Sequence, residues 1–174
     1  MTIDQLKALV RDVPDFPEPG IIFKDLMPLI GNADAFRSTI EQLAEWAKPR
    51  NPDIILGAEA RGFIFGGALA HQLNAGFVPV RKLGKLPGKT IEVEYELEYG
   101  RDALAVHEDA IRPGQRVLAL DDLLATGGSM GAALRLIRQL GGHIVGVAFM
   151  IELAFLHGRD KLKEHPLHSL IVYE

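Results

Sequence analysis

Hydrophobic residues recur along this chain in two alternating patterns. Apolar positions three and four residues apart predict helices, whereas short continuous apolar runs predict buried strands. The predicted helices span residues 3–10, 35–47, 63–73 and 128–140. The predicted strands span residues 53–56, 77–80, 116–120 and 144–151. Such alternation is typical of an α/β fold in which a largely parallel central sheet is flanked by helices.

Two stretches depart from this alternation. Prolines and a glycine at 14–20 disfavour regular structure but lead into the apolar run Ile21–Phe23. This stretch is predicted to be a stiff loop that covers part of the molecule. At 91–99, apolar residues alternate with glutamates, and a turn at 100–102 leads to the short apolar run 103–106. The second pattern predicts a β-hairpin.

Composition limits the class of protein. The 174 residues, 48% of them apolar, suffice for one domain with a substrate cleft, so residues 1–174 are expected to form a single domain. A net charge of −4 gives no general attraction for nucleic acid, so an anionic ligand must be held locally. The absence of cysteine suits the reducing cytoplasm. No uncharged apolar run approaches the roughly 20 residues of a membrane span, so no membrane or targeting segment is expected.

The strongest functional pattern follows the predicted strand at 116–120. Asp121 and Asp122 lie at its carboxyl end, where open α/β sheets bind ligands. The next residues turn into a helix, and glycines there let backbone N–H groups converge on an anion. The candidate phosphate-binding residues are Ala125, Thr126, Gly127, Gly128 and Ser129. The two carboxylates would repel a phosphate but suit a ribose diol, so the pattern indicates a ribose 5-phosphate.

This turn differs from two familiar nucleotide-binding motifs. It lacks the Gly-Lys-Ser/Thr of a P-loop and the Gly-x-Gly-x-x-Gly of a dinucleotide site. Its four apolar residues, two aspartates and Thr-Gly turn instead resemble the signature of the type I phosphoribosyltransferases. The resemblance implies the α/β fold of that family, with a small hood at about 14–27 and a flexible β-hairpin lid at about 82–107.

Further segments resemble the adenine-specific members of that family. They are Phe16–Gly20 with Phe23–Asp25, Glu59–Phe63, Arg81–Gly88, Leu97–Gly100 and Asp121–Gly128. The resemblance implies transfer of 5-phosphoribose from 5-phosphoribosyl 1-pyrophosphate (PRPP) to adenine, giving AMP and pyrophosphate in purine salvage. It also implies Mg²⁺ bound with PRPP rather than at a dedicated protein site, no organic cofactor, and a homodimer.

Two loops are assigned to pyrophosphate by the same resemblance. The first holds Glu59, Ala60 and Arg61, and there the family commonly has a cis peptide, which would join Glu59 to Ala60. The second holds Arg81, Lys82 and Lys85, where cations between glycines and a proline suit a mobile lid. From the residues alone, a solvated basic loop explains the second segment equally well.

The candidate catalytic residues are Arg61, Glu98 and Tyr99. Glu98 is one of four alternating glutamates, so its residue pattern alone favours an exposed strand face. The match of Leu97–Gly100 implies instead that Glu98 handles a proton on the base and that Tyr99 lies near the leaving group. Adenine needs backbone C=O and N–H groups and apolar faces, which Ile22, Phe23 and Lys24 can provide, and the resemblance implies that Leu153 forms the opposite face.

Two alternative functions remain open at this point. A non-catalytic regulator could keep the PRPP site and bind nucleic acid, but it should carry an added module or a basic face. A catalyst could also accept a different base, such as a 6-oxopurine or a pyrimidine. The adenine-type segment Phe16–Gly20 argues against a different base, and the net charge of −4 argues against a nucleic-acid partner.

Overall fold

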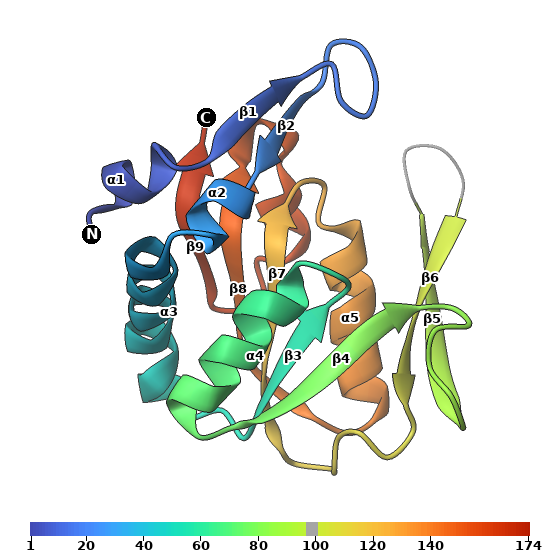
Figure 1. The fold of residues 1–174 in the computed structure, drawn as a ribbon. Coiled ribbons are helices and arrows are strands. Elements are labelled where there is room, and N and C mark those ends of the chain that lie inside the picture. The colour runs from blue at the N-terminus through green and yellow to red at the C-terminus, as the bar shows by residue number, and fades with distance from the viewer. Residues whose placement is uncertain (97–100) are drawn as a thin grey trace.

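The computed structural model describes residues 1–96 and 101–174 and contains a seven-stranded sheet (Figure 1). The strands lie in the order β5-β6-β4-β3-β7-β8-β9. Their bounds are β3 Ile54–Ala58, β4 Gly76–Lys82, β5 Thr90–Glu96, β6 Arg101–His107, β7 Arg116–Leu124, β8 His143–Leu153 and β9 Leu167–Tyr173. Strands β4, β3, β7, β8 and β9 pair in parallel, and β6 and β5 continue the sheet in antiparallel pairs. The predicted α/β class with a largely parallel sheet is confirmed.

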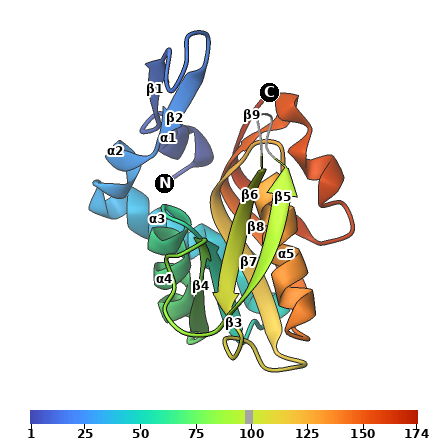
Figure 2. The same ribbon diagram turned by 90° about the vertical axis from the view of Figure 1, so that its right-hand side faces the viewer.

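Helices cover both faces of this sheet. The α-helices are α1 Ile3–Lys7, α2 Met27–Ile30, α3 Ala33–Ala47, α4 Gly62–Leu73 and α5 Gly128–Gln139. Short 3-10 turns are η1 Lys48–Arg50, η2 Ala154–Leu156 and η3 Gly158–Lys161. Helices α3 and α4 lie on one face of the sheet and α5 lies on the other (Figure 2). None of the helices in the described part of the chain is both long and apolar enough to cross a membrane.

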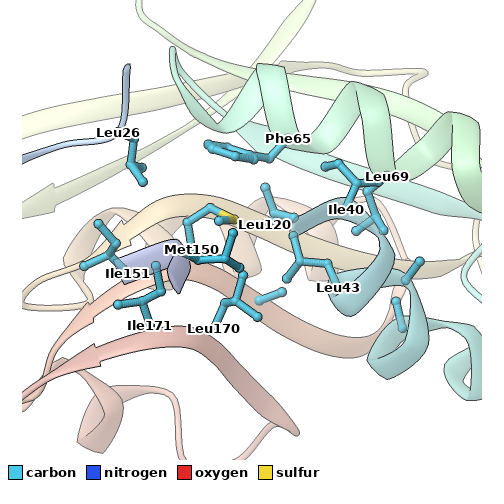
Figure 3. Packing of buried hydrophobic residues seen from close by; sticks show 14 of the residues in the cluster. Leu26, Ile40, Leu43, Phe65, Leu69, Leu120, Met150, Ile151, Leu170 and Ile171 are labelled. Atoms are coloured by element: carbon cyan, nitrogen blue, oxygen red, sulfur yellow. The ribbon is translucent and has the colours of Figure 1, made fainter. Parts of the chain in front are cut away.

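Each face of the sheet has its own hydrophobic core because side chains alternate along every strand. In β7, Leu118 and Leu120 belong to the core under α3 and α4, whereas Val117 and Ala119 belong to the core under α5. Figure 3 shows the first core, where Phe65 and Leu69 of α4 approach Leu120 and Met150 of the sheet. Two packed faces leave the carboxyl edge of the parallel strands as the place where loops can gather around a ligand.

A small two-stranded sheet lies beyond that edge, as Figure 1 shows. Its antiparallel strands are β1 Arg11–Pro14 and β2 Ile22–Asp25. The proline-rich stretch between them forms the connecting loop, in which the Phe16–Pro17 peptide is cis. The sequence predicted the loop but not the strands, because strands of 4 residues with little buried surface leave a weak apolar pattern.

Three details of the sheet differ from the sequence prediction. Strand β7 continues past the two aspartates to Leu124, because pairing with β8 extends that far, to Leu124 opposite Glu152. Arg101 and Asp102, predicted to form a turn, belong to β6 and pair with Glu96 and Tyr95. Strand β9 was not predicted at all. For β7 and β6, pairing with a neighbouring strand overrides the local residue preference. The apolar run Leu170–Tyr173 of β9 itself favours a strand.

Candidate active site

The phosphate turn, residues 125–129, connects β7 to α5 at the carboxyl edge of the sheet. Gly127 caps the helix with φ 77°, a left-handed conformation that favours glycine. A cavity of about 250 Å³ is lined by the whole turn together with Tyr95 and Glu96 of β5. The start of a 12-residue helix facing a small cavity is a suitable anion site, since its first N–H groups lack partners within the helix.

Asp121 and Asp122 lie in β7, just before this turn, and both are buried, each 8% exposed. The Asp122 Oδ2 accepts a hydrogen bond from Arg61 Nε, and the Asp121 Oδ1 accepts one from the Asp122 backbone N–H at 2.8 Å. Burial raises the pKa of Asp121 well above its ordinary value, and the adjacent charge of Asp122 adds to the effect. Two buried carboxylates and one guanidinium form a site that a polar ligand can complete.

The cost of burying Asp121 predicts an effect on stability. Because its pKa is higher in the folded than in the unfolded chain, the ionised carboxylate destabilises the fold above that pKa, and protonation relieves this cost as the pH falls. We therefore expect Asp121→Asn to raise the melting temperature at pH 7, and the gain to shrink toward pH 4. Differential scanning calorimetry across this pH range measures both effects. A variant that melts below the wild type at pH 7 would contradict this expectation.

The first predicted pyrophosphate loop joins β3 to α4. Its Glu59–Ala60 peptide is cis, as the family resemblance implied. The Glu59 Oε2 accepts a hydrogen bond from the Lys82 backbone N–H at 2.9 Å and another from Arg81 Nε at 3.2 Å. Burial favours the protonated carboxyl, but these hydrogen bonds outweigh it and keep the pKa of Glu59 below its ordinary value. Glu59 thus ties the two predicted pyrophosphate loops together.

The second predicted loop begins with Arg81 and Lys82, which are the last two residues of β4, a strand that lies parallel to β3 and beside it. The Arg81 Nη1 donates to the Lys85 carbonyl at 3.2 Å, so these two residues are neighbours. The Lys82 Nζ forms an ion pair with the Asp102 Oδ2 at 2.9 Å, and the Tyr95 hydroxyl donates to the same oxygen at 3.3 Å. Burial, together with the charge of Asp102, raises the pKa of Tyr95 to about 12. Lys82 is thereby held by the β5–β6 hairpin.

A second cavity, of about 470 Å³, lies between the small sheet and α4 and is lined by Val13, Phe16, Phe23, Asp25, Met27 and Arg61. The Phe16 and Phe23 rings meet edge to face at 5.2 Å, and the Arg61 guanidinium lies 5.1 Å from the Phe23 ring. Phe16 is 51% exposed although it is aromatic. An apolar cavity with one cation and one carboxylate suits a flat, partly polar ring.

Asp25 anchors the wall of the cavity just described, which is the candidate base pocket. Its carboxylate accepts hydrogen bonds from the Met27 backbone N–H at 2.9 Å and from the Arg11 Nε at 3.0 Å. The hydrogen bond from Met27 has the largest effect on the pKa of Asp25 and lowers it, and the hydrogen bond from Arg11 lowers it further. Asp25 is therefore ionised and held in place, so the pocket wall is preformed.

The side chains of Lys24 and Leu153, two of the residues predicted to contact adenine, do not line this cavity. The Lys24 ammonium pairs with Asp12 at 2.7 Å and lies 4.2 Å from the Tyr173 ring, so its side chain is occupied outside the base pocket. Leu153 ends β8 beside Tyr173 and packs on the core under α3 and α4. Only Phe23 of the predicted adenine residues lines the base pocket, and Ile22 and Lys24 can reach a base there only through backbone groups.

Four residues that line this pocket were not predicted from the sequence: Val13, Phe16, Asp25 and Met27. Strand alternation could have identified Asp25, because Phe23 and Asp25 are two apart and so share a face of β2. Phe16 lies in the loop between β1 and β2, and Met27 begins α2, so both could be placed only once the path of this segment was known. Glu98 and Tyr99, the two groups predicted to act near the base and the leaving group, lie outside the described residues.

Comparisons with known proteins show the family to which this chain belongs. Residues 29–170 match the model of the phosphoribosyl transferase domain. An adenine phosphoribosyltransferase from Acidobacterium capsulatum is 56% identical over 170 residues, which cover 98% of this chain and 94% of the relative. The crystal structure of adenine phosphoribosyltransferase from Thermoanaerobacter pseudethanolicus superimposes with a TM-score of 0.97 at 50% identity, covering 99% of this chain and all of that one.

A third similarity concerns a liganded protein. The Saccharomyces cerevisiae adenine phosphoribosyltransferase, solved with an imino-altritol bisphosphate and adenine, has a TM-score of 0.92 at 41% identity and covers 97% of both chains. The residues matched by the family model, 29–170, include the phosphate turn and both predicted pyrophosphate loops, and the matches to the three relatives cover 97–99% of this chain. The chain therefore belongs to the phosphoribosyl transferase family and, within it, to the adenine phosphoribosyltransferases.

Proposed function

We propose that this chain transfers 5-phosphoribose from PRPP to adenine, yielding AMP and pyrophosphate in purine salvage, and that Arg61 joins the two halves of the reaction. Arg61 carries this proposal because it lines the base pocket and also donates to Asp122, beside the phosphate turn. A base and a phosphorylated ribose bound at these two places would meet at Arg61. Such proximity converts a reaction of two molecules into one within a single complex.

The phosphate turn binds the 5-phosphate in this proposal. Backbone N–H groups of residues 125–129 and the hydroxyls of Thr126 and Ser129 donate to its oxygens, at the start of α5. Asp121 and Asp122 accept hydrogen bonds from the ribose hydroxyls, which supply the donors that two buried carboxylates need. Together these contacts hold the sugar while its anomeric carbon remains open to the base.

Pyrophosphate is held on the opposite side by the two loops tied through Glu59. The cations Arg61, Arg81, Lys82 and Lys85 and the N–H groups around Ala60 neutralise it. Lys82 must leave Asp102 to reach the substrate, so closing of the hairpin and binding are coupled. Magnesium enters with PRPP as part of the substrate. Mg²⁺ prefers oxygen ligands, so PRPP oxygens and water would supply most of them.

Adenine lies against Phe23 in the base pocket, with its N9 directed toward the ribose. Cleavage of the bond to pyrophosphate builds positive charge on the sugar and negative charge on the departing group, so the protein acts by stabilising charge and by positioning. The electron pair of the broken C–O bond leaves with pyrophosphate, N9 forms the new bond to the anomeric carbon, and the N9 proton is taken up. Glu98 is the proposed acceptor, and Tyr99 acts near the leaving group.

A steady-state assay tests the activity directly. Purified protein is supplied with PRPP, magnesium and, in turn, adenine, hypoxanthine, guanine, xanthine and a pyrimidine base, and both nucleotide and pyrophosphate are measured. We expect AMP from adenine in one-to-one ratio with pyrophosphate and at least a hundredfold lower kcat/KM for the 6-oxopurines, because a pocket built for an amino group leaves polar atoms unpaired with an oxo group. Preference for a 6-oxopurine, or no AMP, would overturn the proposal.

The ribose assignment predicts a selective effect of Asp122→Asn. We expect the KM for PRPP to rise about 10- to 100-fold, because a hydrogen bond to a charged group contributes roughly 1.5–3 kcal/mol. The KM for adenine should change far less. Asp34→Asn is the matched control, since Asp34 is an exposed carboxylate that also pairs with an arginine, Arg37. An unchanged KM for PRPP in Asp122→Asn would remove this residue from ribose binding.

We further propose that the protein acts as a cytoplasmic homodimer. The absence of cysteine suits a reducing compartment. The apolar stretch at the start of α4 supports an interface, because Phe65 is buried in the core while Ile64 is 39% exposed. Sedimentation equilibrium at micromolar concentration tests the dimer, and a monomeric mass under assay conditions would refute it.

A further inference from the structure

Gly158, in η3, lies directly against the phosphate turn. A Cβ added to Gly158 would fall 3.0 Å from the Gly127 backbone N and closer still to the Ala125 carbonyl oxygen. Conversely, a Cβ added to Gly127 would fall 2.7 Å from the Gly158 carbonyl oxygen. The two backbones therefore pack against each other with no room for a side chain between them. The shape of the turn depends on where Gly158 is held.

The residue after Gly158 is tied to the sheet. Arg159 Nε donates to the Glu152 Oε1 at 2.9 Å, and its Nη2 donates to the Oε2 at 2.5 Å, so both carboxylate oxygens are engaged. Glu152 is 4% exposed, and the hydrogen bonds from Arg159 lower its pKa. It lies in β8 opposite Leu124, the last residue of β7 before the turn. This two-point geometry fixes both position and orientation.

The segment that carries Gly158 has little rigidity of its own. It consists of η2 and η3, and its backbone hydrogen bonds join residues three apart, as from His157 N–H to Ala154 and from Asp160 N–H to His157. Such short 3-10 turns are weakly stable in isolation. Beyond Gly158, the segment is fixed by the Glu152–Arg159 pair and by Leu162, which is 1% exposed.

We propose that Glu152, Arg159 and Gly158 form a brace that positions the phosphate turn for the 5-phosphate of PRPP and AMP. Glu152 is fixed beside the strand that leads into the turn, Arg159 clamps η3 to it, and Gly158 supports Ala125 and Gly127 from behind. The brace keeps the N–H groups of the turn convergent without touching the ligand, so these are positioning residues. This inference rests on the proposed assignment of the turn to the 5-phosphate.

The brace can be distinguished from an ion pair that only stabilises the fold. A general loss of structure would weaken the binding of AMP and of adenosine alike, since both ligands occupy the base and ribose sites. Misplacement of the turn would weaken the binding of AMP alone, because adenosine has no 5-phosphate. The ratio of the two dissociation constants therefore reports the turn specifically.

Calorimetric titration of the wild type and its variants with AMP and with adenosine tests the brace. We expect Arg159→Ala to weaken the binding of AMP by about 10-fold or more, because small displacements of binding groups have large effects. The binding of adenosine should weaken by less than about twofold. Arg159→Lys should lie between, because lysine keeps the charge but lacks the planar fork. Gly158→Ala should weaken the binding of AMP at least as much as Arg159→Ala does. Arg138→Ala is the matched control. Arg138 lies in α5 and forms an ion pair with Glu164 at 3.6 Å, and its removal should leave the dissociation constants of both AMP and adenosine unchanged.

The outcomes separate the two proposals. A wild type that binds AMP no more tightly than adenosine would refute the assignment of the turn to the 5-phosphate. A wild type that prefers AMP, with variants that keep the preference or lose both ligands equally, would refute the brace alone. If Arg159→Ala does not fold, the ratio of the AMP and adenosine dissociation constants in Arg159→Lys and Gly158→Ala tests the brace instead.

Discussion

Replacing Glu98 by glutamine is expected to lower kcat about 10²- to 10⁴-fold, the range contributed by general acid–base groups. Glutamine keeps the size of the side chain and one acceptor but cannot take a proton. The KM values for PRPP and adenine should change little, since the proton moves only as the N–C bond forms. Steady-state and single-turnover measurements of AMP formation, made at saturating PRPP, determine the size of the loss and the step at which it occurs.

Glu92→Gln provides the matched control for this experiment. Glu92 belongs to the same alternating series of glutamates and is exposed on β5. If Glu98 were only part of an exposed strand face, the two substitutions would have equal and small effects. A loss confined to Glu98 supports a role in proton transfer, whereas equal kinetics would return Glu98 to the exposed-face interpretation.

Removal of the Arg61 guanidinium is expected to lower kcat/KM for adenine about 10²- to 10³-fold, by comparison with the loss of other preorganised electrostatic donors. Arg61→Ala removes a wall of the base pocket, the partner of Asp122 and a cation of the pyrophosphate loop at once. Arg61→Lys should recover only part of the activity, because a single ammonium cannot donate in the same planar geometry. Arg37→Ala, which removes an exposed arginine from α3, should leave kcat/KM unchanged.

The pH profile gives a second, independent readout of Arg61. Burial and the charge of Asp122 raise the pKa of Asp121, and the positive charge of Arg61 opposes that rise. Without Arg61 the pKa of Asp121 should rise further, so the acidic limb of kcat/KM should move to higher pH. Measurement of kcat/KM from pH 5 to pH 9 shows this displacement. A profile that only drops uniformly would mean that Arg61 does not act on the carboxylate pair.

The amino-acid sequence by itself determined the α/β class, the alternation of the principal helices and strands, and the phosphate turn. These features depend on short-range patterns: apolar periodicity sets which faces are buried, and Gly127 allows the left-handed conformation that the start of α5 requires. Asp121 and Asp122 were identified for a similar reason, since polar residues after a buried apolar run in a parallel strand lie toward its carboxyl end.

The tertiary structure alone decided which distant residues share a site. Phe16, Asp25 and Arg61 line one pocket although up to 45 positions separate them, because β1 and β2 fold over the start of α4. The same holds for Gly158, whose contact with the phosphate turn has no trace in either local pattern. Contacts of this kind depend on the packing of whole elements, and residue spacing carries no information about them.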